Sequence, residues 1–248
     1  MPVPKISLIT VCYNAASTIR RCIESVISQN YPQIEYIIID GASTDDTLRI
    51  INEYRPHIHT LVSEPDQGLY DAMNKGIALA TGEVAGILNA DDFFISNTII
   101  STVAEAFNTT GADIIYGNLN YVNPYGRIIR KWVAGGYKPG AFNWGWMPPH
   151  PTFYARKTLY EHLGSYRLDY GTAADYELML RFMYRHRFKV YYLNMTFLHM
   201  LTGGVSNKSL AGRVKTSRYD LKAMQSNGIH WAYFTIVLKP LRKVLQYL

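Results

Sequence analysis

The chain has 248 residues, of which 48% are hydrophobic and 18% are charged, a composition that can bury a substantial core and excludes a disordered chain. Its 25 Lys and Arg against 19 Asp and Glu leave a net charge of +6, which suits an anionic ligand or surface. Because the basic residues of the first half are scattered and no nucleic-acid-binding motif accompanies them, we expect no nucleic-acid partner.

The start of the chain and its cysteines favour a reducing compartment. Residues 1–7 lack the apolar core of a secretory signal, and no stretch reaches the roughly 18 apolar residues of a membrane-spanning helix. Cys12 and Cys22 are too few for a disulfide framework, so both are expected to pack as small apolar residues. We therefore expect a cytoplasmic protein.

The first hundred residues alternate between strand and helix patterns. Short apolar runs predict strands over 5–11, 34–39, 60–63 and 84–88. The helical face that begins at Ile19 predicts a helix with Ser17 or Thr18 as its N-cap. A second helix is predicted from Ser43 or Thr44, and a third over 70–80. This alternation predicts an α/β fold with a mostly parallel central sheet flanked by helices.

Polar residues follow each of the four predicted strands, at 10–14, 40–47, 64–68 and 89–92. Because parallel strands end at one edge of a sheet, these side chains can converge on one crevice. The adjacent carboxylates of Asp91 and Asp92 can hold a hard divalent cation, although an Asp there can equally cap the next helix. Neither a dinucleotide-binding Gly motif nor a phosphate loop is present.

The second half has a less regular pattern of elements than the first. A strand is predicted over 113–116, a hairpin over 120–133 with its turn at 123–126, and a long irregular stretch over 135–151. Three side chains of this stretch can form a platform for a sugar ring or can simply pack within the loop: Trp144, Trp146 and His150. Residues 229–248 are aromatic and basic, so they either lie in a membrane interface or form a terminal helix on the domain, with Pro240 interrupting the pattern.

Taken together, the motifs resemble the inverting family 2 glycosyltransferases, which have an A-type glycosyltransferase fold. The resemblance covers residues 5–205 and is carried by Thr-Val-Cys-Tyr-Asn at 10–14, Asp-Gly-Ala-Ser-Thr-Asp-Asp-Thr at 40–47, Asn-Ala-Asp-Asp at 89–92 and Ala-Asp-Tyr-Glu-Leu at 174–178. The segments 64–76 and 203–206 are similar to enzymes of bacterial surface-polysaccharide assembly. The resemblance implies a single domain with a nucleotide-sugar-binding half (1–100), an acceptor-binding half (101–206) and C-terminal helices (207–248).

The resemblance also implies roles for single residues on the donor side. Tyr13 is expected to stack on the nucleobase, and the other nucleotide-sugar contacts are Thr10, Asn14, Asp40 and Asp91, with Asp91 mainly on the ribose. Many family members carry a second Asp where this chain has Gly41, and we expect Asp66 to compensate. The structural alternative for Asp40 is a carboxylate at the start of a helix.

Asp92 is expected to hold a Mn or Mg ion on the diphosphate of a nucleoside diphosphate sugar, by the same resemblance. His199, shortly before Gly203 and Gly204, is a second metal or phosphate contact or else a structural histidine. Asp175 is expected to be the catalytic base; in many relatives an acidic residue precedes it, where this chain has Ala174. The alternative for Asp175 is a helix cap.

The implied activity is transfer of a sugar, with a uridine donor favoured, to a hydroxyl of a glycan or of a polyprenyl-diphosphate-linked glycan, at the inner face of the cytoplasmic membrane. The Trp144, Trp146 and His150 platform would then bind the acceptor. Two alternatives stay open: a sugar nucleotidyltransferase, and a non-catalytic carbohydrate-binding or scaffold protein on the same fold.

Overall fold

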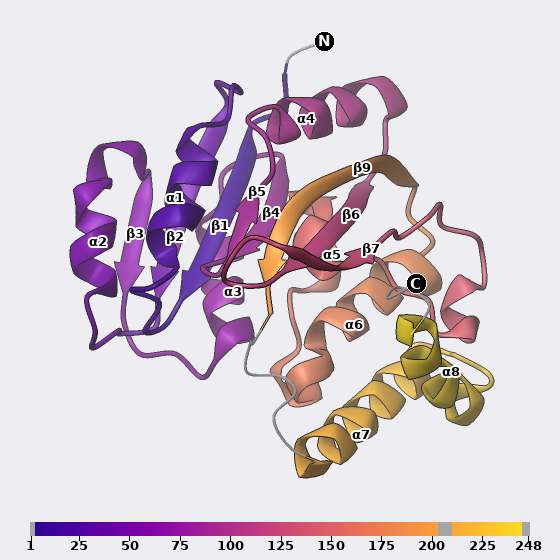
Figure 1. The fold of residues 1–248 in the computed structure, drawn as a ribbon. Helices are drawn as coiled ribbons and strands as arrows, with labels where there is room; N and C mark the ends of the chain where they lie inside the picture. Colours follow the sequence, from indigo (N-terminus) through magenta and orange to yellow (C-terminus); the bar gives the residue numbers. More distant parts are fainter. Residues whose placement is uncertain (1–2, 203–209, 245–248) are drawn as a thin grey trace.

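The four apolar runs of the first hundred residues form parallel strands, as predicted. The computed structural model describes residues 3–202 and 210–244, with side chains described outside 210–215 and 243–244; the segment 203–206 lies outside it. The strands are β1 (Ile6–Cys12), β2 (Ile34–Asp40), β3 (Thr60–Ser63) and β4 (Val84–Asn89). They lie side by side in the order β3-β2-β1-β4, and their carboxyl ends meet at one edge of the sheet (Figure 1).

Helices follow these strands, although one N-cap and one helix start differ from prediction. The helices are α1 (Ile19–Ile27), α2 (Thr47–Glu53), α3 (Leu69–Leu79) and α4 (Ile99–Thr110). Thr18 precedes α1, but its hydroxyl donates to the carbonyl of Ala15 and caps no helical amide. The start of α2 comes later than expected, because the segment from Ser43 to Asp46 is a loop bonded to neighbouring turns.

The second half extends the same sheet with strands of both directions. These strands are β5 (Asp92–Phe94), β6 (Ile114–Val122), β7 (Ile128–Trp132), β8 (Tyr154–Arg156) and β9 (Val190–Leu201). The order continues β4-β8-β6-β9-β5, with β7 paired to β6. The predicted hairpin is confirmed by the β6–β7 pair, whose turn closes through Gly126 N to Asn123 O at 2.9 Å. The first four strands are all parallel, whereas antiparallel pairs in the second half make the sheet mixed.

The remaining helical segments are short except at the C-terminal end. They are η1 (Arg55–His57), η2 (Ala141–Trp144), η3 (His150–Thr152), α5 (Lys157–Leu163), η4 (Leu168–Ala173), α6 (Ala174–Met179), η5 (Leu180–Arg185), α7 (Leu210–Ser226) and α8 (Ala232–Val244). The segment η5 is a π-helical turn that continues α6. The stretch 135–151 is irregular, as predicted, apart from η2 and the start of η3.

Two apolar layers enclose the sheet. One contains the buried faces of α1, α2 and α4, and the other contains those of α3, α5 and α6 together with α7 and α8 (Figure 1). Cys12 and Cys22 are buried thiols in the first layer. Continuous apolar strands such as β2 are therefore covered on both faces, which is the condition for a stable parallel sheet. Within the described residues, no helix combines the length and apolar character needed to cross a bilayer.

The C-terminal helices pack on the domain. Gly145 lies so close to α8 that an added Cβ would be 2.7 Å from the amide nitrogen of Lys239. Thr235 donates to the carbonyl of Asn143 at 2.6 Å, and Lys239 pairs with Asp220 of α7 at 2.7 Å. This packing matches the terminal-helix alternative for the tail, while one face of α8 stays exposed.

Candidate active site

The loops that follow β1 and β2 are bonded into one surface at the carboxyl edge of the sheet. Asn14 adopts a positive φ of 48°, and its side-chain oxygen accepts the amide of Thr44 at 2.8 Å. In return, the amide of Asn14 donates to the hydroxyl of Ser43 at 2.8 Å, and the amide of Ala15 donates to Thr47 at 2.7 Å. Asn14 therefore shapes this edge through its own loop contacts.

Asp40 is fully buried and forms hydrogen bonds with the same loop. Its carboxylate accepts the amide of Ser43 at 3.0 Å and the hydroxyls of Ser43 and of Ser63, the latter at 2.7 Å. The helix-start alternative is wrong, because α2 begins only at Thr47. Because these donors bond to its oxygens, Asp40 links the carboxyl ends of β2 and β3.

The structure does not place Thr10 at the crevice. Thr10 is fully buried within β1, and its hydroxyl lies 3.1 Å from the hydroxyl of Tyr36 and 3.8 Å from the sulfur of Cys22. Its side chain thus points into the layer of α1, away from the strand end. The Thr10 side chain therefore has a packing role, and a nucleoside contact by this residue stays a prediction.

Tyr13, Gly41 and Asp66 converge from three different loops. The ring of Tyr13 is 64% exposed, directly after β1. A Cβ built on Gly41 would lie 3.5 Å from Cδ2 of Tyr13 and 3.2 Å from Cγ of Asp66, and would overlap Oδ2 of Asp66. The other oxygen of Asp66 accepts the amide of Gly68 at 2.7 Å. An exposed aromatic face and a carboxylate therefore stand together at the strand ends.

Asp92 carries a buried carboxylate oxygen that has no hydrogen-bond partner among the residues that the structure describes. Asp92 opens strand β5 and α4 begins only at Ile99, so the helix-cap alternative for this pair is wrong. Its Oδ2 accepts the side-chain amide of Asn89 at 3.2 Å, whereas Oδ1 is unpartnered. Burial raises the pKa of Asp92 well above its ordinary value, and the adjacent Asp91 raises it further. Burial also raises the pKa of Asp91.

These two carboxylates fit a divalent cation. An unpaired buried carboxylate is costly, and a cation would supply the missing partner charge. No cluster of three or more His, Cys, Asp and Glu side chains arranged to hold a metal occurs among the residues that the structure describes. One or two carboxylates suffice for Mg or Mn when phosphate oxygens and water complete the shell.

His199 does not join Asp92. In the β5–β9 pair, Asp92 lies opposite Met200 and Phe93 lies opposite His199, so Asp92 and His199 project from opposite faces of the sheet. The His199 ring packs edge-on against Phe93 at 5.3 Å, and burial lowers its pKa. These contacts favour the structural alternative for His199; Gly203 and Gly204 lie outside the described residues.

Asp175 stands in the first turn of α6, half-buried, with its helix anchored as predicted. The side chains of Leu178, Met179 and Phe182 are fully buried. Its Oδ1 accepts the amide of the next residue, Tyr176, at 2.7 Å, which is not the bond of an N-cap. The carboxylate is therefore oriented by its helix and remains available to a ligand.

Three side chains that the sequence analysis did not connect surround Asp175. The hydroxyl of Tyr70 lies 3.4 Å from the carbonyl of Thr172, and burial raises its pKa well above the ordinary value, with Asp175 adding to the shift. Tyr166 stacks at a tilt on Tyr70 at 5.5 Å, and its hydroxyl is 2.7 Å from Nε2 of His150. Burial lowers the pKa of His150, which keeps the imidazole neutral near pH 7.

Helix α3 links this group to the donor side. Asn74 forms two hydrogen bonds with the backbone of Tyr166, each of 2.8 Å. Lys75 pairs with Glu64 at 2.7 Å and donates to the carbonyl of Pro65 at 2.9 Å, which pins the loop that carries Asp66. Tyr70 and Asn74 are four residues apart and so lie on one helix face. This spacing is visible in the sequence and could have predicted that they act on the same group.

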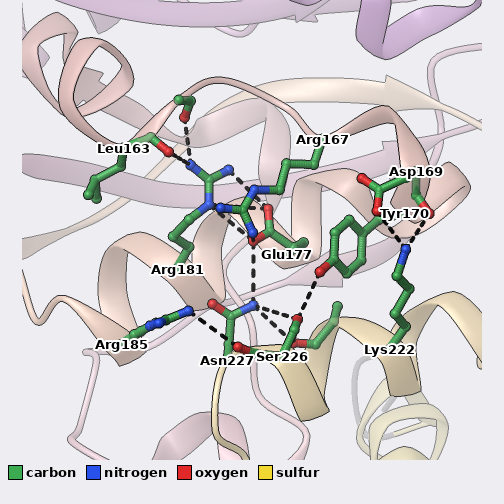
Figure 2. Close-up of polar contacts among 12 residues, drawn as sticks. Leu163, Arg167, Asp169, Tyr170, Glu177, Arg181, Arg185, Lys222, Ser226 and Asn227 are labelled. Carbon is green, nitrogen blue, oxygen red and sulfur yellow. Dashed lines mark hydrogen bonds and ion pairs between the residues drawn. The ribbon is translucent and has the colours of Figure 1, made fainter.

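A buried ion pair fixes α6 in place (Figure 2). Glu177 is fully buried, and Arg181 one turn later binds both of its oxygens, at 3.0 and 2.9 Å. The same guanidinium donates to the carbonyls of Leu163, Gly164 and Ser165 at 2.6 to 2.8 Å. Arg167 adds a contact to Glu177 at 3.3 Å. Figure 2 shows the side chains of Arg167 and Arg181 converging on Glu177.

The three expected acceptor residues do not form one exposed platform. Trp146 is 8% exposed, packs among Tyr116, Tyr137 and Phe142, and donates its indole N–H to the carbonyl of Ala134 at 2.8 Å. His150 is buried beside Tyr166. Only Trp144 is exposed, where it meets Phe234 of α8. For Trp146, the loop-packing alternative fits the structure.

Comparison with known proteins gives a consistent result. Residues 7–165 match the sequence profile of glycosyl transferase family 2. The PGL/p-HBAD biosynthesis glycosyltransferase of Mycobacterium tuberculosis is 30% identical over 189 residues, which cover 73% of this chain and 70% of that protein.

Solved structures share the fold at low identity. TarS 1–349 of S. aureus in complex with UDP superposes with a TM-score of 0.69 and 18% identity, over 92% of this chain and 68% of that one. The mannosyltransferase PcManGT of Pyrobaculum calidifontis in complex with GDP-Man and Mn²⁺ gives 0.68 and 16%, over 99% and 76%. The predicted A-type glycosyltransferase fold is confirmed.

The ion pair of α6 makes a stability prediction. Arg181→Met would leave Glu177 buried without its main partner, and we expect the free energy of unfolding to fall by about 3–5 kcal/mol. Urea unfolding followed by circular dichroism measures the loss. Arg49→Met is the matched control, because Arg49 forms only exposed ion pairs. Equal stability of the two variants would contradict the assigned role, and the double variant Glu177→Leu/Arg181→Met should be more stable than Arg181→Met alone.

Proposed function

Because the chain belongs to glycosyl transferase family 2, we propose that it is an inverting glycosyltransferase that moves a sugar from a nucleoside diphosphate sugar to a hydroxyl of a glycan acceptor. Family membership establishes glycosyl transfer; the donor, the acceptor and the stereochemistry are the proposal. One observation carries it. Carboxylates from separate elements, Asp66, Asp91 with Asp92, and Asp175, belong to segments at the carboxyl edge of β1 to β4, where open α/β sheets bind ligands.

Asp175 acts as the general base in this proposal. It takes the proton of the acceptor hydroxyl while the oxygen attacks the anomeric carbon from the face opposite the diphosphate. The new C–O bond forms as the bond to the diphosphate breaks, and the diphosphate leaves with that electron pair. The hydroxyl of Tyr70 stays protonated because its pKa is raised, so it can hold the carboxylate in position.

Asp92, with Asp91 beside it, would hold a Mn or Mg ion. Such an ion supplies charge that stabilises the departing diphosphate. The unpartnered Oδ1 of Asp92 supports this assignment. In the same proposal, residues 1–100 bind the donor, with Tyr13 under the base, and residues 101–206 bind the acceptor.

The acceptor is proposed to be a glycan on a polyprenyl diphosphate at the inner face of the cytoplasmic membrane. The support is the outer face of α8, formed by Tyr233, Phe234, Val237 and Leu241, all more than half exposed. Trp144 adjoins this face through Phe234. Residues 229–248 contain no Asp or Glu, and Arg242 is exposed there. An apolar, aromatic helix face beside positive charge suits an anionic lipid surface.

Removal of the base tests the mechanism. We expect Asp175→Asn to lower turnover by about 10²- to 10⁴-fold, because no general base then accepts the proton of the acceptor hydroxyl. UDP binding should be unchanged. The assay follows release of nucleoside diphosphate from several nucleoside diphosphate sugars and, in separate reactions that contain a nucleoside triphosphate and a sugar 1-phosphate, release of pyrophosphate. Asp169→Asn is the control, since Asp169 is an exposed carboxylate paired with Lys222. Wild-type turnover in Asp175→Asn would refute the assignment, and pyrophosphate release would indicate nucleotidyl transfer instead.

The metal assignment has its own test. Asp92→Asn preserves the shape of the side chain and replaces a buried carboxyl group whose charged form burial disfavours, so we expect the protein without metal to be at least as thermally stable as the wild type. The Mn-dependent tightening of UDP binding should disappear, whereas binding in the presence of a chelator should be unchanged. Thermal-shift titration measures both. A variant that keeps the full Mn effect would exclude Asp92 as a ligand.

Sedimentation with vesicles tests the membrane surface. We expect the wild type to bind vesicles of phosphatidylglycerol and not of phosphatidylcholine, and Phe234→Ser/Val237→Ser to lose that binding. Tyr125→Ser removes an exposed aromatic residue from the β6–β7 turn and is the control. Undiminished sedimentation of the double variant would contradict the proposal. A wild-type dimer that the double variant abolishes would also contradict it, because the α8 face would then bind a second copy of the chain.

A further inference from the structure

The position of Asp66 requires the absence of a side chain at residue 41. Gly41 is buried, and its amide donates to the carbonyl of Cys12 at 2.9 Å, which fixes it between the ends of β1 and β2. Oδ2 of Asp66 occupies the space that a Cβ on Gly41 would take. Gly41 has an ordinary backbone conformation, so the missing side chain serves the approach of Asp66 rather than a turn.

The carboxylate of Asp66 is held in place before any ligand binds. Its Oδ1 accepts the amide of Gly68 at 2.7 Å, and Gly68 has the positive φ of 113° that this turn needs. Lys75 pins the same loop through Glu64 and the carbonyl of Pro65. Oδ2 has no comparable bond in this loop and lies over Gly41, next to the exposed ring of Tyr13. A flat ring beside a fixed acceptor is a suitable arrangement for a heterocyclic base.

We propose that Asp66 reads the base of the donor by accepting its ring N–H at Oδ2, and that Gly41 is the residue that admits this carboxylate. The inference rests on the proposed transferase function and names the base class that the site takes. The fold alone leaves the base open, because TarS was solved with UDP and PcManGT with GDP-Man.

The bonding of Asp66 favours an imide pyrimidine. Uracil and thymine present a single N–H between two carbonyl oxygens, which one free carboxylate oxygen can accept. Guanine presents two adjacent donors that suit both oxygens of a carboxylate, but Oδ1 of Asp66 is already bonded to Gly68. Cytosine presents a ring acceptor at the same position, which a carboxylate repels. UDP and dTDP are therefore the expected ligands.

Calorimetric titration with UDP and N3-methyl-UDP, in the presence of Mn²⁺, tests the contact. A hydrogen bond to a charged group corresponds to roughly 10- to 100-fold in affinity, so the wild type should bind UDP more tightly than N3-methyl-UDP by about that factor. Asp66→Ala should lose the preference while keeping its thermal unfolding transition. Gln67→Ala is the control, because Gln67 is exposed in the same loop and only its backbone amide is bonded.

Gly41→Ala provides a second variant that keeps the carboxylate. The added methyl group should displace Oδ2 and reduce the preference for UDP, which a purely structural role of Asp66 would not do. Retention of the preference in Asp66→Ala would overturn the proposal, and retention in Gly41→Ala would overturn the role assigned to Gly41. Titrations with dTDP, GDP and CDP complete the test.

The outcomes separate this inference from the proposed function. Tighter binding of GDP than of UDP, with sugar transferred from a GDP-sugar, would overturn the base assignment and leave glycosyl transfer intact. Equal binding of dTDP and UDP supports the imide contact, and weaker binding of dTDP supports it with an added contact to the ribose 2′-hydroxyl. Failure to bind any nucleoside diphosphate, with none released from any donor, would overturn both.

Discussion

The geometry of the site depends on one buried ion pair, that of Glu177 with Arg181. Two charges in the core are costly unless each is matched and hydrogen-bonded, and here the guanidinium also binds three backbone carbonyls just before Tyr166. These bonds fix the position of α6 relative to that loop. Asp175 lies two residues before Glu177 on the same helix, so the pair fixes where the candidate base stands.

Helix α3 relates the two sides of the site to each other. At its start Tyr70 lies beside Asp175, and one turn later Asn74 clamps the backbone of Tyr166. Lys75, the next residue, holds the loop that carries Asp66. A single rigid helix therefore sets both the donor-side loop and the surroundings of the candidate base, and a change in one would be transmitted to the other through backbone contacts.

Some groups at this edge lower the stability of the isolated protein. Asp92 has a raised pKa and a buried oxygen that lacks a partner within the described residues. By contrast, Asp40 has its oxygens bonded to Ser43 and Ser63, and it maintains the scaffold. Buried polar groups that lack protein partners often mark functional positions, where a ligand completes the bonding. This contrast separates a carboxylate with an oxygen open to a ligand from one whose oxygens the protein already bonds; the expected nucleoside contact of Asp40 stays a prediction.

The sequence by itself determined the parallel strands and their helices, since hydrophobic periodicity and apolar runs depend only on local order along the chain. It also determined the family, from motifs at the strand ends, and the anchoring of Asp175 by Leu178, Met179 and Phe182. Helix starts were less predictable, because side-chain bonds between loops, such as that of Asn14 to Thr44, delayed α2.

Only the tertiary structure decided which side chains meet. β1 is apolar on both faces, so its pattern did not reveal that Thr10 points into the α1 layer. The register of β5 against β9 put His199 and Asp92 on opposite faces, and dense packing buried Trp146 and His150. Likewise, the approach of Asp66 to Gly41 joins two loops that are distant in the chain. Such contacts depend on pairing register and packing between remote segments, which local sequence patterns do not encode.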